Sequence, residues 1–272
     1  MLGSFEKHEG AISTLATRGN RLATAGLDLS FILWDVVTGN VATQLSTASV
    51  IRGLDFTFAN DVHFCTDHSM NKECFIGHYD TRTGACSRLH TPDVSTTKIF
   101  RYEDFLIFSS VDGTVHKLDL RTNRPVKEQK IHQSRITSLR PSSCGSFFVT
   151  ASSDASVRII DSETFVQKKR FDCDEPINSA CVFHTNDKLV AVGGIDARDV
   201  TTTRGKSTFD TNMFDVVTQK KIGAYTTHFG TINAVDTHPR STHYISGGED
   251  GSVCLIQLGR DFFSAPFTDM NQ

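Results

Sequence analysis

One unit of about thirty residues occurs twice in this sequence, at positions 132–161 and 228–257. In both copies a histidine is followed by a hydroxyl residue eighteen positions later, an aspartate twenty-two later and an isoleucine twenty-eight later. The matched pairs are Thr150 and Ser246, Asp154 and Asp250, and Ile160 and Ile256. Agreement at four chemically distinct positions indicates a tandem repeat, and a repeat constrains the fold more than any other feature of the chain.

Four weaker copies lie around the two clear ones. The first begins at His8 and ends at Asp35. Taking the six copies to end at positions 35, 80, 119, 161, 215 and 257, their spacings are 45, 39, 42, 54 and 42 residues. The second copy has six extra residues, which would lengthen a hairpin, and the fifth contains a long excursion. The repeat period therefore centres on the forties.

Each copy consists of short β-branched or aromatic runs separated by turn residues. Residues 147–150, for example, are Phe-Phe-Val-Thr, and Asp-Gly pairs at 112–113 and 250–251 suit tight hairpin turns. No segment longer than about ten residues keeps an amphipathic helical period. The sequence predicts an all-β protein, a β-propeller of six blades with four antiparallel strands each, in a single domain over residues 1–272.

The N-terminal residues fit the closure of such a propeller. Residues 2–6 precede the first histidine, where the outermost strand of a preceding blade would lie. We expect them to pair with residues 252–258 and so to remove a free sheet edge. Residues 262–267 are the alternative closing strand, which Pro266 makes less suitable.

The recurring polar residues predict a structural hydrogen-bond network within the blades. Histidine, hydroxyl, aspartate and tryptophan side chains can link an outer loop to an inner hairpin. A hydrolase triad is the alternative interpretation of a His/Ser/Asp set, but a triad would occur once and not at every repeat. The predicted network residues are His8, Thr24, Asp28, Trp34, His132, Thr150, Asp154, His228, Ser246 and Asp250.

Composition excludes several other classes of protein. A net charge of -3 with 22% charged residues gives no general attraction to nucleic acid or anionic membranes. The seven scattered cysteines indicate reduced thiols in an intracellular protein, and we expect neither a signal peptide nor a membrane span. Residues 204–207 end like a phosphate-binding loop, but Val200 stands where that motif needs glycine. His63 and His68 lack the further ligands of a metal site, so we expect no metal and no cofactor.

Four stretches carry a resemblance to a known family. They are PINSACVF at 176–183, VGGIDARDVTTT at 192–203, HFGTINAV at 228–235 and SGGEDGSV at 246–253. The copies as a whole resemble WD40 repeats, and these stretches in this order resemble the i subunit of eukaryotic translation initiation factor 3. The likeness covers essentially the whole chain, and residues 199–203 are its most specific part. Members of this family usually have seven blades, so the chain resembles a reduced form without the first blade, with seven blades as the alternative.

The resemblance implies a cytoplasmic, non-catalytic scaffold in translation initiation. Its implied partners are the C-terminal helix of the b subunit, the g subunit and, within the complex, the small ribosomal subunit, with no sequence-specific nucleic-acid binding and no membrane. In the family that helix docks on the flank of two consecutive blades, which correspond here to the fourth and fifth. The implied contact residues are Ile159, Asp161, Asp199, Val200, Thr201, Thr202 and Thr203.

Alternative interpretations remain open at this point. Asp161 also fits the ordinary aspartate that ends a blade strand, and residues 199–203 also fit a β-rich excursion without a partner. Another intracellular WD40 adaptor, such as a ubiquitin-ligase substrate receptor or a signalling scaffold, is the competing function.

Overall fold

The computed structural model describes residues 4–57, 61–68, 72–195, 208–259 and 262. The regular elements in this part of the chain are β-strands, and no helix there is long and apolar enough to cross a membrane. The chain divides into two compact units, Met1–Leu139 and Arg140–Gln272, with the boundary inside β13. The expected single domain over residues 1–272 stays a prediction.

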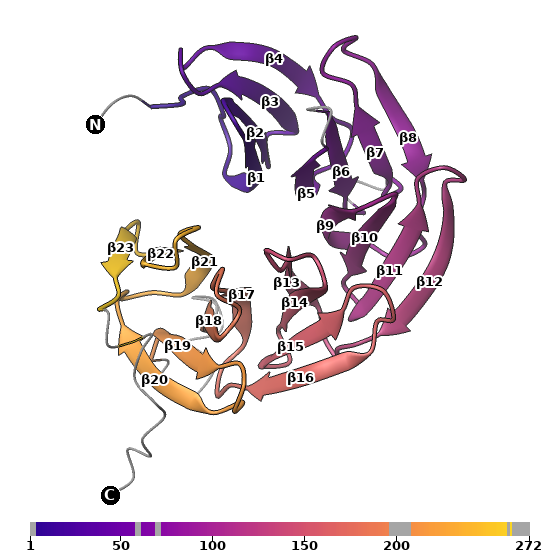
Figure 1. Ribbon diagram of the computed structural model, residues 1–272. Coiled ribbons are helices and arrows are strands. Elements are labelled where there is room, and N and C mark those ends of the chain that lie inside the picture. Colours follow the sequence, from indigo (N-terminus) through magenta and orange to yellow (C-terminus); the bar gives the residue numbers. More distant parts are fainter. Residues whose placement is uncertain (1–3, 58–60, 69–71, 196–207, 260–261, 263–272) are drawn as a thin grey trace, which may run out of the picture. The chain divides into compact units, whose positions relative to one another are not determined.

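The first unit contains three four-stranded antiparallel sheets, each built from strands in chain order (Figure 1). The first sheet is β1 (Ile12–Arg18), β2 (Arg21–Gly26), β3 (Ser30–Asp35) and β4 (Val41–Ser46). The second is β5 (Ile51–Phe56), β6 (Val62–Thr66), β7 (Ile76–Tyr79) and β8 (Cys86–His90). The third is β9 (Thr96–Tyr102), β10 (Phe105–Ser110), β11 (Thr114–Asp119) and β12 (Arg124–Lys130).

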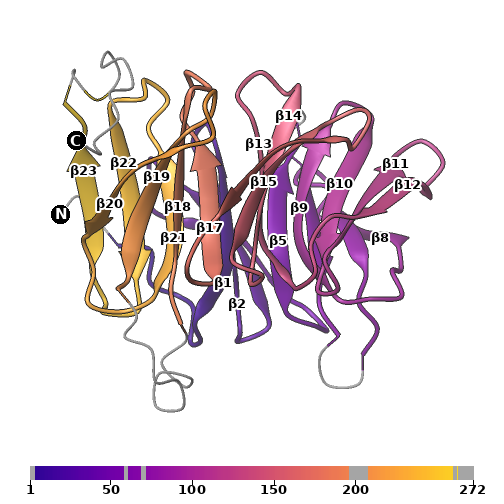
Figure 2. The same cartoon turned by 90° about the horizontal axis from the view of Figure 1, so that it is seen from below.

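The second unit continues the same pattern, and β17 to β23 run up and down beside one another in Figure 2. The fourth sheet is β13 (Ile136–Pro141), β14 (Phe147–Ser152), β15 (Ser156–Asp161) and β16 (Gln167–Asp172). The fifth is β17 (Ile177–Val182), β18 (Lys188–Gly193), β19 (Asp210–Asp215) and β20 (Lys221–Thr226). The sixth has three strands within the described residues, β21 (Ile232–Thr237), β22 (His243–Gly248) and β23 (Val253–Gln257).

Six sheets formed by six successive repeats make this chain a six-bladed β-propeller, which confirms the predicted fold class. The predicted hairpin turns are present. Gly113 has a φ of 88°, and a Cβ there would collide with the carbonyl oxygen of His132. Only glycine can adopt this positive φ and leave room for that carbonyl oxygen without strain, which explains the Asp-Gly pair at this turn.

The cores lie between neighbouring sheets. In the second unit, Val149 and Ile159 of the fourth sheet pack with Ala180 and Phe214 of the fifth. The other face of the fifth sheet packs Met213 and its neighbours against the sixth. Most strands of the fourth and fifth sheets therefore bury side chains on both faces, at about 1.5 to 3 kcal/mol per large aliphatic side chain.

The second and fifth repeats differ in structure from the other repeats at the positions where their sequences contain extra residues. Nine residues separate β6 from β7, whereas three separate β2 from β3, so the six extra residues lengthen that hairpin as expected. In the fifth repeat, sixteen residues separate β18 from β19, and positions 196–207 among them lie outside the described residues.

The described part of the N-terminal segment, residues 4–7, does not form a strand. The Phe5 ring instead packs edge-on against Trp34, with 5.3 Å between ring centroids. Pairing of residues 2–6 with residues 252–258 would join the two units, and it stays a prediction. Of the alternative closing segment, 262–267, only Phe262 is among the described residues.

Candidate partner-binding site

The structure brings together the polar side chains of the first repeat. His8 Nδ1 lies 3.0 Å from Asp28 Oδ2, and His8 Nε2 lies 2.8 Å from Thr24 Oγ1. Trp34 Nε1 donates to the same hydroxyl at 2.9 Å. Burial alone would raise the pKa of Asp28, but hydrogen bonds from Ser30 and His8 outweigh it and hold that pKa below its usual value. The carboxylate therefore stays charged and ties the loop at His8 to the hairpin.

The sixth repeat repeats this arrangement without tryptophan. His228 Nδ1 lies 3.1 Å from both oxygens of Asp250, and His228 Nε2 lies 2.9 Å from Ser246 Oγ. The Ser252 hydroxyl and the Phe229 amide also donate to Asp250 and lower its pKa. The network is one hydrogen bond shorter than in the first repeat because Ile256 stands where Trp34 would be.

The predicted network residues of the fourth repeat belong to two different units. His132 belongs to the first unit, whereas Thr150 and Asp154 belong to the second, so the expected link between them stays a prediction. Within the second unit, Asp154 Oδ1 accepts from the amide and the hydroxyl of Ser156 at 3.1 and 2.6 Å. Asp154 thus stabilises its hairpin in the same way as Asp250.

Burial argues against a hydrolase at these positions. The hydroxyls of Thr24 and Ser246 are buried, and His228 is inaccessible as well. Thr24 is engaged by both His8 and Trp34. A nucleophile must reach its substrate, so a buried hydroxyl that recurs in two repeats favours a structural role.

The two described contact residues of the fourth repeat have different surroundings. Ile159 is buried in the core between the fourth and fifth sheets. Only a small part of its side chain is therefore accessible to a partner. Asp161 Oδ1 accepts from the amides of Glu163 and Thr164 at 3.2 and 2.8 Å, while Oδ2 lies 3.3 Å from Lys168 Nζ. These bonds, led by the Thr164 amide, lower the pKa of Asp161 to about 2.

Asp161 shares its turn role with other repeats. Asp35 and Asp215 also end third strands, Asp80 directly follows one, and all three accept from amides two or three positions ahead. The main role of Asp161 is therefore to stabilise the turn that follows its strand. One of its oxygens still faces a lysine at the surface, so a partner role stays a prediction.

Beside Asp161 lies an exposed apolar flank that the sequence did not single out. Val166, before β16, and Val217, in the turn before β20, are both exposed valines. Lys169 Nζ donates to the carbonyl oxygen of Val217 at 2.8 Å, and the Arg170 amide donates to Gln219 Oε1 at 3.5 Å. The fourth and fifth sheets thus meet at a surface that combines aliphatic and charged side chains. Val217 follows the strand-ending Asp215 by two positions, which is the sequence signal available for it, whereas Val166 has no such signal.

The predicted contact residues Asp199, Val200, Thr201, Thr202 and Thr203 lie outside the described residues, as do positions 204–207 of the phosphate-loop-like stretch. The chain that leads into this excursion is fixed by hydrogen bonds. The Gly194 amide donates to the carbonyl oxygen of Pro176 at 3.0 Å, and the Thr231 hydroxyl donates to that of Ile195 at 2.7 Å.

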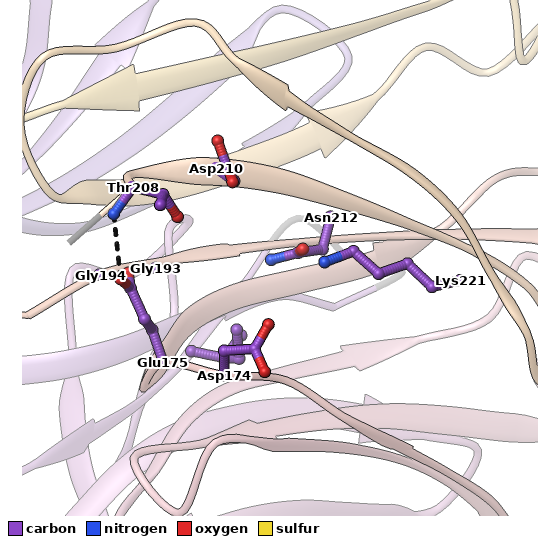
Figure 3. A pocket seen from close by; sticks show the side chains of 9 residues that line it. Asp174, Glu175, Gly193, Gly194, Thr208, Asp210, Asn212 and Lys221 are labelled. Carbon is purple, nitrogen blue, oxygen red and sulfur yellow. Dashed lines mark hydrogen bonds between the residues drawn. The ribbon is translucent and has the colours of Figure 1, made fainter. Parts of the chain in front are cut away.

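A small polar pocket lies at the base of the excursion (Figure 3). Asp174, Glu175 and Asp210 contribute carboxylates, and Lys221 contributes the single ammonium among the lining side chains. The Thr208 amide donates to Glu175 Oε1 at 3.0 Å, which fixes the chain where it leaves the excursion. The excess of carboxylates makes the electrostatic potential here negative, which suits a basic partner segment.

The described residues offer no cluster of three or more His, Cys, Asp or Glu arranged for a metal ion. The two histidines considered from the sequence have separate surroundings. The His63 ring packs 5.1 Å from the His78 ring, whereas His68 Nδ1 lies 3.0 Å from Ser95 Oγ.

Comparison with known proteins agrees with this architecture. The sequence model of the WD40 family (WD domain, G-beta repeat) matches residues 123–161 and 219–257. These ranges contain the two copies that are clearest in the sequence. The chain is similar to proteins named eukaryotic translation initiation factor 3 subunit I. Identity is 33% to the Bombyx mori protein, 31% to that of Drosophila willistoni and 30% to that of Drosophila melanogaster.

These alignments span nearly all of both partners. They cover 98% of this chain and 85 to 87% of the relatives. The expected loss of one blade stays an expectation, since the extra length of the relatives does not by itself say which blade it forms. The similarity extends over all six repeats, including the two irregular ones, and the chain belongs to the family of eukaryotic translation initiation factor 3 subunit I.

Proposed function

We propose that this chain is a non-catalytic, cytoplasmic scaffold within initiation factor 3 that binds the C-terminal helix of the b subunit and the g subunit. Through them it supports assembly on the small ribosomal subunit. Family membership supports the place in translation initiation. The buried His/hydroxyl/Asp networks support a structural rather than a catalytic role for these residues.

The observation that carries the docking site is the flank between the fourth and fifth sheets. Exposed Val166 and Val217 would bury the apolar side of an amphipathic helix, while Asp161 would face its basic side. The negative pocket lined by Asp174, Glu175 and Asp210 would add attraction for basic side chains. Aliphatic anchors next to carboxylates suit a helix with one apolar and one basic face.

A charge on this flank tests the site. Val217 is 70% exposed, so Val217→Glu leaves the core unchanged and should weaken capture of a tagged C-terminal segment of the b subunit at least tenfold. Val37 offers a matched control, because it is 73% exposed and also follows a strand-ending aspartate by two positions. Val37→Glu should bind as the parent does. Equal losses in both variants, or no loss in Val217→Glu, would contradict this site.

The acidic residues need a second experiment. Replacing Asp161 and Asp199 with lysine should leave a folded protein that no longer captures the b subunit. Because Asp161 also holds its turn, Asp161→Asn separates turn stability from the charge a partner would meet. Undiminished capture by the double lysine variant would remove both residues from the site.

The competing function is another WD40 adaptor, and no observation specific to this chain favours it. Affinity purification from the native cell distinguishes the two. Recovery of other initiation-factor subunits together with the small ribosomal subunit supports the proposed function, and their absence defeats it.

A further inference from the structure

The two carboxylate oxygens of Asp161 have different tasks. Oδ1 accepts from the Glu163 amide at 3.2 Å and from the amide and hydroxyl of Thr164, both at 2.8 Å. Oδ2 instead lies 3.3 Å from Lys168 Nζ, and the side chains of this ion pair are 25% and 53% exposed. An ion pair as exposed as this one is weak, because water competes for both charges. Another cation can therefore take the place of Lys168 without disturbing the turn.

The fifth sheet has a different arrangement at the same position. Asp215 ends β19 as Asp161 ends β15, and its Oδ2 lies 2.7 Å from Lys188 Nζ. Lys188 is the residue opposite Asp215 in the register, and both side chains are only 11% exposed. In the fourth sheet the residue opposite Asp161 is Phe147, which carries no charge. The cation beside Asp161 comes instead from the outermost strand, β16, at the surface.

A bulge in β16 directs Lys168 toward this carboxylate. Ile159 of β15 lies opposite Lys169. The next pair joins Ile160 to Gln167, so Lys168 is an extra residue with no residue of β15 opposite it. An extra residue of this kind bends its strand and re-aims its side chain. Here the re-aimed ammonium group meets the aspartate that ends the preceding strand.

The same bulge recurs in three other sheets without a charge. The first, third and fifth sheets shift register at the same place, seven residues after the aspartate that ends their third strand. The residues at this position are Ala42, Val126 and Ile222. An uncharged side chain thus suffices for the bulge, and the fold does not require a lysine there. Among these four bulges the charge stands in the fourth sheet, next to the proposed docking flank.

We propose that Lys168 is an intramolecular competitor for the docking site, which holds Asp161 Oδ2 in the free chain and is displaced by a basic side chain of the docking helix. This inference rests on the proposed function, which places the basic face of that helix on Asp161. Because the turn donors hold Oδ1, the incoming cation has to bind Oδ2, which the Lys168 ammonium occupies. A segment without a basic side chain at this point leaves the ion pair intact and gains nothing from Asp161. Lys168 therefore lowers the affinity of the site and raises its selectivity.

Charge variants test this competition in binding titrations at physiological ionic strength. Lys168→Gln keeps most of the side-chain length and loses the charge, so the full chain should bind the tagged C-terminal segment of the b subunit about threefold more tightly. Lys168→Arg keeps the charge and should bind no more tightly than the parent. Lys220→Gln is the matched control, because it removes the same charge from the turn that carries Val217, and it should bind as the parent does. No tightening in Lys168→Gln, or equal tightening in Lys220→Gln, would overturn the proposal.

A double-mutant cycle separates displacement at Asp161 from any other effect of the lysine. Asp161→Asn removes the charge for which Lys168 and the helix compete. In that background Lys168→Gln should no longer tighten binding, because no carboxylate is released. Tightening that persists without the Asp161 charge would mean that Lys168 acts at another point of the flank, and the proposal would be wrong.

The same titrations distinguish this inference from the proposed function. If the parent binds the b-subunit segment and Lys168→Gln binds it no more tightly, the competition is wrong and the docking site stands. If neither the parent nor Lys168→Gln binds the segment, the docking site fails and the inference falls with it.

Discussion

Strands β15 and β23 occupy the same position in their repeats, with similar apolar patterns, and have very different surroundings. The first reads Ser-Val-Arg-Ile-Ile-Asp from Ser156, and residues 252–257 read Ser-Val-Cys-Leu-Ile-Gln. Val157 is fully buried whereas Val253 is 71% exposed, and Ile159 is 4% exposed whereas Leu255 is 69% exposed. Both segments form strands, each paired with the strand before it. Local sequence thus sets the strand and its alternation, and the neighbouring elements set the burial.

The largest expected effect is a charge placed at the second of these matched positions. Ile159→Lys puts an ammonium group into the core between two sheets and should leave the protein unfolded or insoluble, a loss of more than about 4 kcal/mol. Leu255→Lys should change the free energy of unfolding of the isolated chain by less than about 0.5 kcal/mol. Denaturant titration of both variants gives the answer. A large loss for Leu255→Lys would show that the Leu255 side chain is covered within the chain itself.

A smaller effect is expected from removing methyl groups. Val157→Ala creates a cavity beside Ile159 and should cost about 1 to 3 kcal/mol, because its neighbours cannot fully collapse. Val253→Ala removes methyl groups that already face solvent, and should cost almost nothing in the isolated chain. Similar losses in guanidinium titrations would mean that the two strands are equally buried in solution.

The first repeat extends the comparison to the hydrogen-bond network. Trp34 stands where the fourth and sixth repeats have Ile160 and Ile256, and its indole donates to Thr24. Trp34→Phe keeps most of the apolar area but leaves that acceptor one donor short, so we expect a loss of about 1 to 2 kcal/mol. Thr24→Val in the same background should then cost less than it does in the parent. Additive losses in this double-mutant cycle would argue that the bond contributes nothing.

The smallest expected effect concerns the strand-ending position. Asp161 has a pKa lowered to about 2, while Gln257 at the same position carries no charge. A carboxylate whose pKa is depressed by folding stabilises the protein above its unfolded pKa, near 4, and that stabilisation is lost as the pH falls through about 2. Asp161→Asn should therefore cost about 1 kcal/mol at pH 7 and little near pH 2. Denaturation at both pH values measures the difference, and a loss independent of pH would point to the lost turn geometry instead.

Some of the site was predictable from the sequence because it recurs. The spacing of His228, Ser246 and Asp250 matches that of His132, Thr150 and Asp154, and a repeated set of that kind indicates a blade network. The two irregular repeats were visible as extra residues. Val166 and Val217 were not predicted. The spacing of Val217 from Asp215 recurs at Val37 and Asp35, so it does not by itself mark a partner site, and only packing shows that both valines are exposed.

The period, the number of repeats and the strands of each could be predicted from the residues alone, since these follow from spacing, alternation and turn residues. The residues that could form hydrogen-bond networks were predictable in the same way. The burial of Ile159, the exposure of Leu255 and the hydrogen bonds by which Asp161 holds its turn became visible in the folded chain. The physical reason is that burial depends on which sheet lies against each face, and two strands with the same apolar pattern can have different neighbours.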